Sequence, residues 1–324
     1  MEFNWTLFAQ YLILGVTNGA LIALIALGYT LVYGIVELIN FAHGEVFMMG
    51  AFLSLSAVSA FGLVSNAGWA QIALVSLVAM LAAMLFSGVL NWSIDRVVYR
   101  RLRSAPRLAP LIAAIGISFI LQGIGIYWKG STTVLPPNLI PTDIRSINIL
   151  TDWFGLDTRL RFRALDLAVI LLTVPLLIGL SWLVYRTRTG KAMRAVAQDR
   201  GAAALMGIDV NRTIAIAFLV GGILAGAAGF ITAYYTNTAR FQMGFRYGLF
   251  AFTAAVLGGI GNLNGAVLGG LIIGLVWSMS DGFLQTYISW WGAQWTPLII
   301  FGVLVLVMIF KPTGLLGEAV PEKV

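Results

Sequence analysis

A single histidine and a nearby carboxylate are the residues of this chain best suited to chemistry. His43 is the only histidine, and Glu45 follows it within the segment FAHGEVFMMGAF, residues 41–52. Their types and spacing could serve a metal site, a proton relay, a substrate contact or the frame of a turn. The segment joins two strongly apolar stretches, so its role depends on what those stretches are.

A metal centre or a hydrolytic active site lacks the residues that it needs. One histidine and no cysteine leave too few nitrogen and sulfur ligands for a histidine-based zinc site. The sequence contains neither H-E-x-x-H nor G-x-S-x-G, the patterns of zinc proteases and serine hydrolases. We therefore assign no catalytic and no metal-binding residues, and an intramembrane enzyme is disfavoured.

The composition is that of a membrane protein. Hydrophobic residues make up 60% of the chain and charged residues 10%, against roughly 25% charged residues in soluble domains. Runs such as Tyr11–Val36 and Trp69–Leu90 are nearly free of charge and reach the length of about 20 residues that crosses a bilayer as a helix. We predict an all-α, polytopic integral membrane protein, with residues 1–324 forming a single transmembrane domain.

The apolar segments predict about eight or nine membrane spans. They lie near residues 11–36, 45–61, 70–92, 108–128, 165–185, 213–235, 248–260, 265–280 and 296–310. The count is open by one because a glycine-rich join separates the two short segments before the last span, and that join could be re-entrant. The start of the chain has no basic n-region, so we expect the first span to be retained.

The basic residues predict the orientation. Residues 95–107 carry five arginines and one aspartate, and residues 186–212 carry six basic and two acidic residues. The positive-inside rule places both loops in the cytoplasm, and the loop at about 129–165 outside. The N-terminus is then expected outside and residues 311–324 inside. Because the positive charge is confined to such loops, we expect contact with membrane lipid and none with nucleic acid.

The His43 segment has an echo in the second half of the chain. The sequence around His43-Gly44-Glu45-Val46 can be laid over Asn264-Gly265-Ala266-Val267. Two helix breaks rich in Gly and Asn, in a possible internal repeat, are typical of a solute path, although two tight turns at the membrane surface fit equally well. On the first interpretation, the residues that line the path or hold its gate are Asn40, His43, Glu45, Asn262 and Asn264.

The loop at about 187–212 predicts a docking element. The stretch KAMRAVAQDRGAAALMGI shows a short helical pattern of small residues, which Gly207 is placed to end. Such a helix at the cytoplasmic face fits the groove of a partner protein, or alternatively lies on anionic lipid. We expect the partner contacts to come from Arg194, Ala195, Asp199, Ala202, Ala203 and Gly207.

Four stretches together resemble the permeases of branched-chain amino-acid ABC importers. They are GYTLVYGIVELINFAHGEVFMMGAF, TGKAMRAVAQDRGAAALMGID, AFTAAVLGGIGNLNGAVLGGLIIG and the closing KPTGLLG, and the resemblance covers about residues 10–317. It implies a multi-pass protein of the bacterial inner membrane that forms the channel with a second, related permease subunit. It also implies two cytoplasmic ATPases docked on the coupling helix at 189–207, and a periplasmic binding protein that delivers leucine, isoleucine or valine. Close relatives carry urea, short amides or other amino acids.

The chain lacks a nucleotide-binding motif. Gly190-Lys191 is its only Gly-Lys pair, and Ala192 follows where a P-loop requires Ser or Thr. We therefore expect no cofactor on this chain and ATP on the partner subunits. A proton-coupled or sodium-coupled transporter, with His43 and Glu45 as a relay, is the alternative. The resemblance favours a gate or its hydrogen-bonded frame at these two residues.

Overall fold

A computed structural model describes residues 3–36, 40–62, 68–103, 105–106, 108–137, 139–140, 145–156 and 159–317. In these ranges the chain is helical, and its β-structure is confined to two isolated bridges, Val134–Ala239 and Asn148–Arg163. The prediction of an all-α protein is confirmed.

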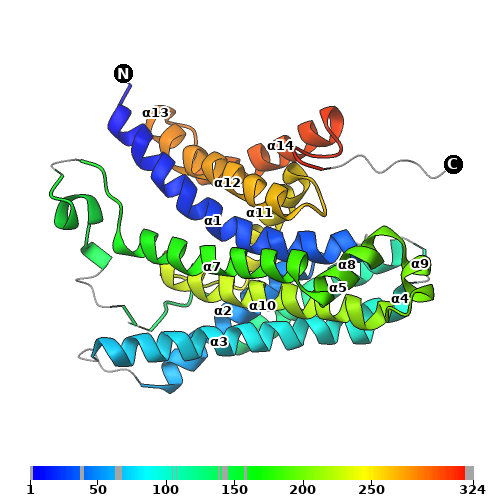
Figure 1. Cartoon of the computed structure of the whole chain (residues 1–324). Helices are drawn as coiled ribbons and strands as arrows, with labels where there is room; N and C mark the ends of the chain where they lie inside the picture. Colours follow the sequence, from blue (N-terminus) through cyan, green and yellow to red (C-terminus); the bar gives the residue numbers. More distant parts are fainter. Residues whose placement is uncertain are drawn as a thin grey trace.

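Most helices follow one another with short connections, whereas a long connection that carries η2 joins α5 to α7 (Figure 1). In chain order they are α1 (Trp5–Val36), α2 (His43–Ala60), α3 (Trp69–Ile94), η1 (Asp95–Tyr99), α4 (Arg100–Leu102), α5 (Leu108–Lys129), η2 (Ile149–Trp153), α7 (Ala164–Arg186), α8 (Arg188–Gln198), α9 (Arg200–Leu205), α10 (Val210–Thr236), α11 (Met243–Gly258), α12 (Leu263–Ser278), η3 (Met279–Leu284), α13 (Gln285–Tyr287), η4 (Ala293–Trp295) and α14 (Thr296–Phe310). The elements η1, η2 and η3 are π-helical, and η4 is a 3₁₀ turn.

In the described ranges, seven helical segments are long and apolar enough to cross a membrane. They are Trp5–Val36, Trp69–Leu102, Leu108–Lys129, Ala164–Arg186, Val210–Thr236, Leu263–Tyr287 and Ala293–Phe310. The other two predicted segments correspond to the shorter apolar helix α11 and to α2, which has 18 residues. Every predicted segment is thus a helix, and the prediction of a polytopic membrane protein is confirmed.

Helices α1, α2 and α10 form the centre of the bundle. Residues 21–27 of α1 are almost completely buried, as is the first half of α2. Helix α1 packs along α12, and α10 packs along α3 and α2. Glycines make the first contact close: a Cβ added to Gly274 of α12 would lie 2.2 Å from the Cα of Gly19. Small residues such as these glycines let helix backbones touch, which stabilises helix association in a membrane, where lipid supplies no hydrophobic driving force for it.

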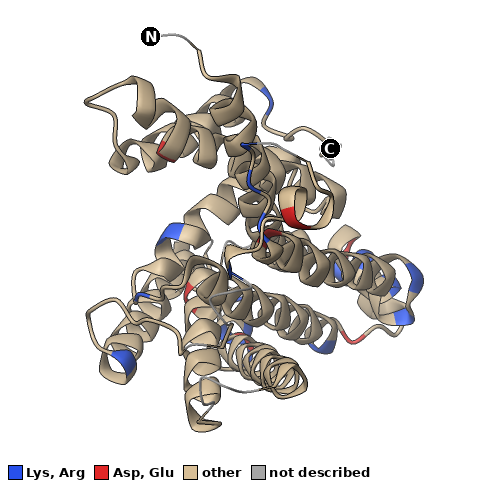
Figure 2. Ribbon diagram, turned by 90° about the vertical axis from the view of Figure 1, so that its left-hand side faces the viewer, with Lys and Arg blue, Asp and Glu red and all other residues tan. Residues whose placement is uncertain are grey.

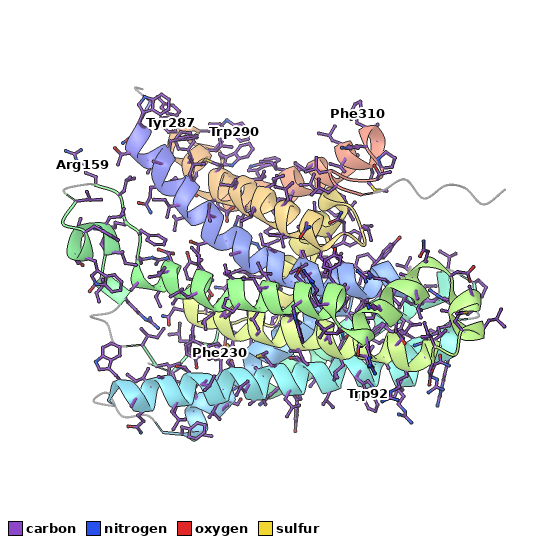
Figure 3. The ribbon with its side chains drawn as sticks, in the orientation of Figure 1. Trp92, Arg159, Phe230, Tyr287, Trp290 and Phe310 are labelled. Atoms are coloured by element: carbon purple, nitrogen blue, oxygen red, sulfur yellow. The ribbon has the colours of Figure 1, made fainter. Side chains whose placement is uncertain are left out.

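The two basic connections lie at the same end of the bundle. Figure 1 places α4, α8 and α9 together at one end, and the N-terminus and α13 toward the other. Charged positions are sparse along the helices and concentrate near their ends and connections (Figure 2). Arg159, Tyr287 and Trp290 lie toward the end with the N-terminus, whereas Phe310 lies toward the opposite end (Figure 3). We call the end with α8 and α9 the basic end.

Candidate functional site

Helix α2 begins inside the bundle rather than at its end. Its first residue, His43, packs against the backbone of α1 at Gly28, where an added Cβ would lie 2.3 Å from Nε2 of the imidazole. Helix α1 continues beyond this level to Val36. The first predicted break is therefore enclosed by other helices and is not a turn at the bundle end. Residues 37–39 of this segment lie outside the described part of the chain.

Asn40 holds the start of α2 in place. Its side-chain oxygen accepts hydrogen bonds from the Tyr99 hydroxyl at 2.9 Å and from the Ala42 amide at 3.1 Å. Its amide nitrogen donates to Asn91 of α3 at 3.4 Å, and Asn91 donates in turn to the Phe218 carbonyl of α10 at 2.7 Å. Since Asn40 and Asn91 are both buried, these bonds provide the pairing that buried amides require. The break is framed by α3, η1 and α10.

His43 lies in an aromatic and glycine-lined site without a strong polar partner. Its ring meets that of Tyr29 edge-on at a centroid distance of 4.7 Å. The Ile25 carbonyl of α1 is near the imidazole, but neither ring nitrogen makes a hydrogen bond of good geometry. In the described residues, no three His, Asp or Glu side chains come together as metal ligands. The environment of His43 is that of a packed helix start.

Glu45 reaches from α2 toward α5. Its Oε1 accepts hydrogen bonds from the Gln122 amide at 2.8 Å and from the Ser118 hydroxyl at 3.2 Å. Its Oε2 has no hydrogen-bond partner, although the residue is fully buried. That oxygen faces Gly244 of α11, where an added Cβ would lie 2.2 Å away. A buried carboxylate oxygen without a partner costs free energy, and an ionisable residue inside a membrane span is by default a functional-site hypothesis.

A groove of about 1,030 Å³ opens beside this carboxylate. It is lined by Phe41, Ile115, Ser118, Phe119, Gln122, Thr236, Thr238, Arg240, Gln242, Met243, Phe245, Arg246, Tyr247, Leu249, Phe250 and Pro297. Its polar lining includes Thr236, Thr238, Arg240 and Gln242 at the end of α10 and the α10–α11 connection, which the Ala239–Val134 bridge ties to the segment after α5. Phe41, immediately before α2, also lines it. The groove therefore extends from the α10–α11 connection, at the end of α10 away from the basic end, to the buried helix break.

A second cavity lies on the other side of the break and is nearly closed. It measures about 10 Å³ and is lined by Tyr29, Thr30, Val32, Tyr33, Asn40, His43, Phe252, Ala255 and Ile260. Such a volume holds one water at most. Phe41 of the groove and Phe252 of this cavity are in contact as a tilted ring pair, with centroids 5.7 Å apart. This aromatic pair, together with Tyr29 and His43, separates the groove from the small cavity.

The second predicted break lies elsewhere. Gly261 packs against Gly34 in the last turns of α1, so the α11–α12 join is close to the basic end. Asn262 caps α12 by accepting from the Gly265 amide at 2.9 Å, and it donates to the Leu316 carbonyl at 2.7 Å. Asn264 is exposed and lines a separate shallow groove with α7. The structure thus places Asn40, His43 and Glu45 at the buried start of α2, and Asn262 and Asn264 at the distant α11–α12 join.

The loop predicted to dock a partner is not one helix but two. Helix α8 ends at Gln198, and Asp199 caps α9 by accepting from the Gly201 and Ala202 amides at 2.8 and 3.0 Å. The single helix was wrong because an aspartate at this position competes for backbone donors and starts a new helix. Gly207, with φ of +81°, ends α9 as predicted.

The predicted partner contacts differ in exposure. Arg194, Asp199, Ala202 and Gly207 are exposed, Ala195 is half-buried, and Ala203 is buried in the chain's own core. The most exposed apolar side chains of the loop are Leu205 and Met206, at 90% and 82%. These two form the outer tip of the loop.

Polar links at both ends hold the elements around the groove. At the basic end, Arg103 pairs with Asp95 at 2.6 Å and donates to Asn211 at the start of α10. At the opposite end, Arg163 pairs with Asp166 at 3.2 Å and donates to the Tyr235 hydroxyl. Partial burial lowers the pKa of Arg163, but the hydrogen bond and charge of Asp166, with Tyr235, outweigh this and raise that pKa above its ordinary value.

Sequence reasoning missed several residues of this site. Ser118 and Gln122 lie within an apolar run, and their spacing of one helical turn was the signal that both face the same neighbour. Asn91 and Tyr99 gave a similar but weaker signal near the end of α3. Polar side chains in a membrane span face the protein interior.

Comparison with known proteins gives the family. Residues 11–309 match the family model described as branched-chain amino acid transport system / permease component. The chain is 37% identical to the high-affinity branched-chain amino acid transport system permease protein BraD of Pseudomonas aeruginosa, over 98% of each chain. It is 35% identical to LivH of Escherichia coli over 100% of both chains, and 27% identical to a probable LivH of Methanocaldococcus jannaschii over 92% of this chain and 89% of that one. The groove, the enclosed break and the basic-end loop described above are therefore features of a member of the family of permease components of branched-chain amino acid transport systems.

Proposed function

We propose that this chain is a permease subunit of an ATP-driven importer in the bacterial inner membrane. It forms the translocation path for leucine, isoleucine and valine together with a second, related permease subunit. Two cytoplasmic ATPases bind at the basic end, and a periplasmic binding protein delivers the substrate at the opposite end. The BraD and LivH proteins, which this chain matches over its full length, are named as permeases of branched-chain amino acid transport systems.

The observation that carries the proposal is the groove that ends at the buried start of α2. A broken helix at membrane depth is tolerated where it lines a cavity, and interrupted segments of this kind mark substrate paths in transporters. The groove has apolar walls at Ile115, Phe119 and Leu249 and polar groups at Ser118 and Gln122. Such a surface suits a small zwitterion with a branched aliphatic side chain.

The closed Phe41–Phe252 pair suits the inner barrier of this path. With the groove open toward the binding-protein end and the small cavity closed, the arrangement corresponds to outward access. During transport, the ATPases would move the α8–α9 loop, part this aromatic pair and release the substrate toward the basic end. The second permease subunit would cover the open side of the groove.

Transport by the reconstituted complex tests the proposal. The full chain is co-purified with its partner permease and ATPases and placed in liposomes, and the uptake of radiolabelled leucine is followed with ATP and binding protein. We expect uptake to require both and to survive collapse of the proton gradient. Uptake without ATPase subunits, or its loss when only the proton gradient is collapsed, would instead identify a secondary transporter. Competition by urea and short amides decides among the substrates of related permeases.

A further inference from the structure

Arg200 connects the basic-end loop directly to the last turn of α1. Its Nη2 donates a hydrogen bond to the Val36 carbonyl at 2.6 Å and to the Ile35 carbonyl at 3.2 Å. The arginine is the first residue of α9, and the two carbonyls belong to the final residues of α1. The contact joins elements that lie 164 residues apart in the sequence.

Among the described residues, no other group donates a hydrogen bond to these two carbonyls. The last four carbonyls of an α-helix have no intrahelical donor, and they carry the negative end of the helix dipole. A guanidinium can donate hydrogen bonds to two carbonyl oxygens, and its permanent positive charge is favourable at the negative end of the helix dipole. The cap of α1 is thus supplied by the loop that we propose as the ATPase contact.

The position of α1's last turn gives this cap a further consequence. Asn40 and the start of α2 follow Val36 within a few residues, and Asn40 is fixed to α3 and η1 through Asn91 and Tyr99. Arg200 therefore bonds α1 only four positions before Asn40 in the sequence. The neighbouring Arg194 points elsewhere: its guanidinium stacks on Tyr185 at 5.4 Å.

We infer that Arg200 is a positioning residue for transport, which transmits movement of the α8–α9 loop to the α1–α2 break. Helix α8 also packs on α1 and α10 through apolar side chains, so loop and bundle remain in contact without the arginine. What the arginine adds is a directional, charged link to the end of α1. This inference rests on the proposed function for its second test, but not for its first.

The first test needs only the full chain in nanodiscs. Hydrogen exchange is measured for peptides covering the last turn of α1 and residues 40–47, in the wild type, R200Q and R194Q. R200Q removes the charge-assisted hydrogen bonds to the two carbonyls. If these bonds disfavour local opening of the end of α1 by a factor of ten, amide exchange there should become about tenfold faster. R194Q, which removes an exposed arginine of the same loop, should leave it unchanged. Unchanged exchange in R200Q would overturn the inference.

The second test uses the reconstituted complex and compares ATP hydrolysis with leucine uptake. We expect R200Q to keep ATPase activity within about twofold while uptake per ATP falls by about tenfold, a loss of one factor of ten in coupling. R200K should be intermediate, because an ammonium keeps the charge but not the planar two-oxygen geometry. If R200Q does not fold, R200K takes its place in both tests.

The outcomes separate the inference from the proposed function. Parallel losses of ATPase activity and uptake in R200Q would make Arg200 a folding or docking residue and overturn the inference. If the wild-type complex takes up no leucine with ATP, the proposed function fails. The exchange measurement still decides whether Arg200 holds the α1–α2 break.

Discussion

Phe41 and Phe252 form a tilted ring pair, with a centroid distance of 5.7 Å, between an open groove and an almost closed cavity. Phe41 precedes a helix that starts inside the bundle, and Phe252 belongs to α11, which also forms the groove wall. The two rings therefore lie on the proposed path and belong to two separate elements, the segment just before α2 and helix α11. That combination allows a barrier to open when the two elements move apart.

Removing one ring of this pair should open a leak. We expect F252A to raise ATP-independent leucine flux by about tenfold, because apolar constrictions close such paths by excluding solute and water. Flux is measured in liposomes without nucleotide. F245A is the matched control, since Phe245 also lines the groove but is 63% exposed and is not part of the ring pair. Equal flux in the two variants would place the barrier elsewhere.

Glu45 should tolerate an amide better than truncation. In E45A, the Ser118 and Gln122 donors lose their acceptor in a buried site, at a cost of about 1–3 kcal/mol. In E45Q, the side-chain oxygen still accepts from both, so we expect near-normal thermal stability in detergent but reduced uptake. If E45Q transports like the wild type, the ionised carboxylate has no part in the path.

Variants of the hydrogen-bonded frame around Asn40 should lose more stability when more of its hydrogen bonds are removed. N40A deprives Tyr99, Asn91 and the Ala42 amide of partners, so we expect a loss of about 1–3 kcal/mol for each buried group left unpaired. Y99F removes only one of these bonds and should cost less. Thermal unfolding of both variants gives the order. A larger loss in Y99F would show that Asn40 is not the centre of the network.

The α1–α12 contact should not accept a methyl group. In G274A the new Cβ would lie 2.2 Å from the Gly19 Cα, so the two backbones must separate. Overpacking of this kind costs about 1–3 kcal/mol, which should lower the unfolding temperature and the yield. G302A is the control: it is also within a helix, but no atom lies within 4 Å of its added Cβ. It should be neutral or slightly stabilising.

The loop tip should decide whether the ATPases co-purify. Replacing Leu205 and Met206 by serine removes the two most exposed apolar groups of the loop, and we expect the retained ATPase to fall by about tenfold, equivalent to about 1.4 kcal/mol. L108S is the control, because Leu108 is 68% exposed at the start of α5. Unchanged retention in the loop variant would move the docking surface away from this tip.

The sequence predicted the helices well because membrane spans are encoded locally. Each apolar run matched a helix, and the break before His43 was visible from His43, Gly44 and Glu45 alone. The depth of the two breaks was not visible, since it depends on which helices surround them. His43 lies beside Gly28, well before the end of α1, whereas Gly261 lies beside Gly34.

Long-range polar partners were also beyond the sequence. Gln122 is 77 residues from Glu45, and no periodicity links such positions. In the sequence, Arg200 is one of several arginines in the 187–212 loop. Only the fold shows that its side chain bonds the Ile35 and Val36 carbonyls of α1, and no other bond described for that loop does so. Asn262 as a path residue stays a prediction, while its role as the cap of α12 is clear from its bond to Gly265.

The early start of α2 also has an electrical consequence. A water-filled groove would carry the potential at its outer end down to Phe41, so most of the membrane voltage would fall across the protein between Phe41 and the basic end. An ion crossing that region exchanges about 2.3 kcal/mol per charge for each 100 mV with the field. A zwitterion with zero net charge does no such work. The zero net charge of the substrate therefore makes its proposed passage insensitive to membrane voltage, while a substrate of either charge would be driven or opposed by the field beyond Phe41.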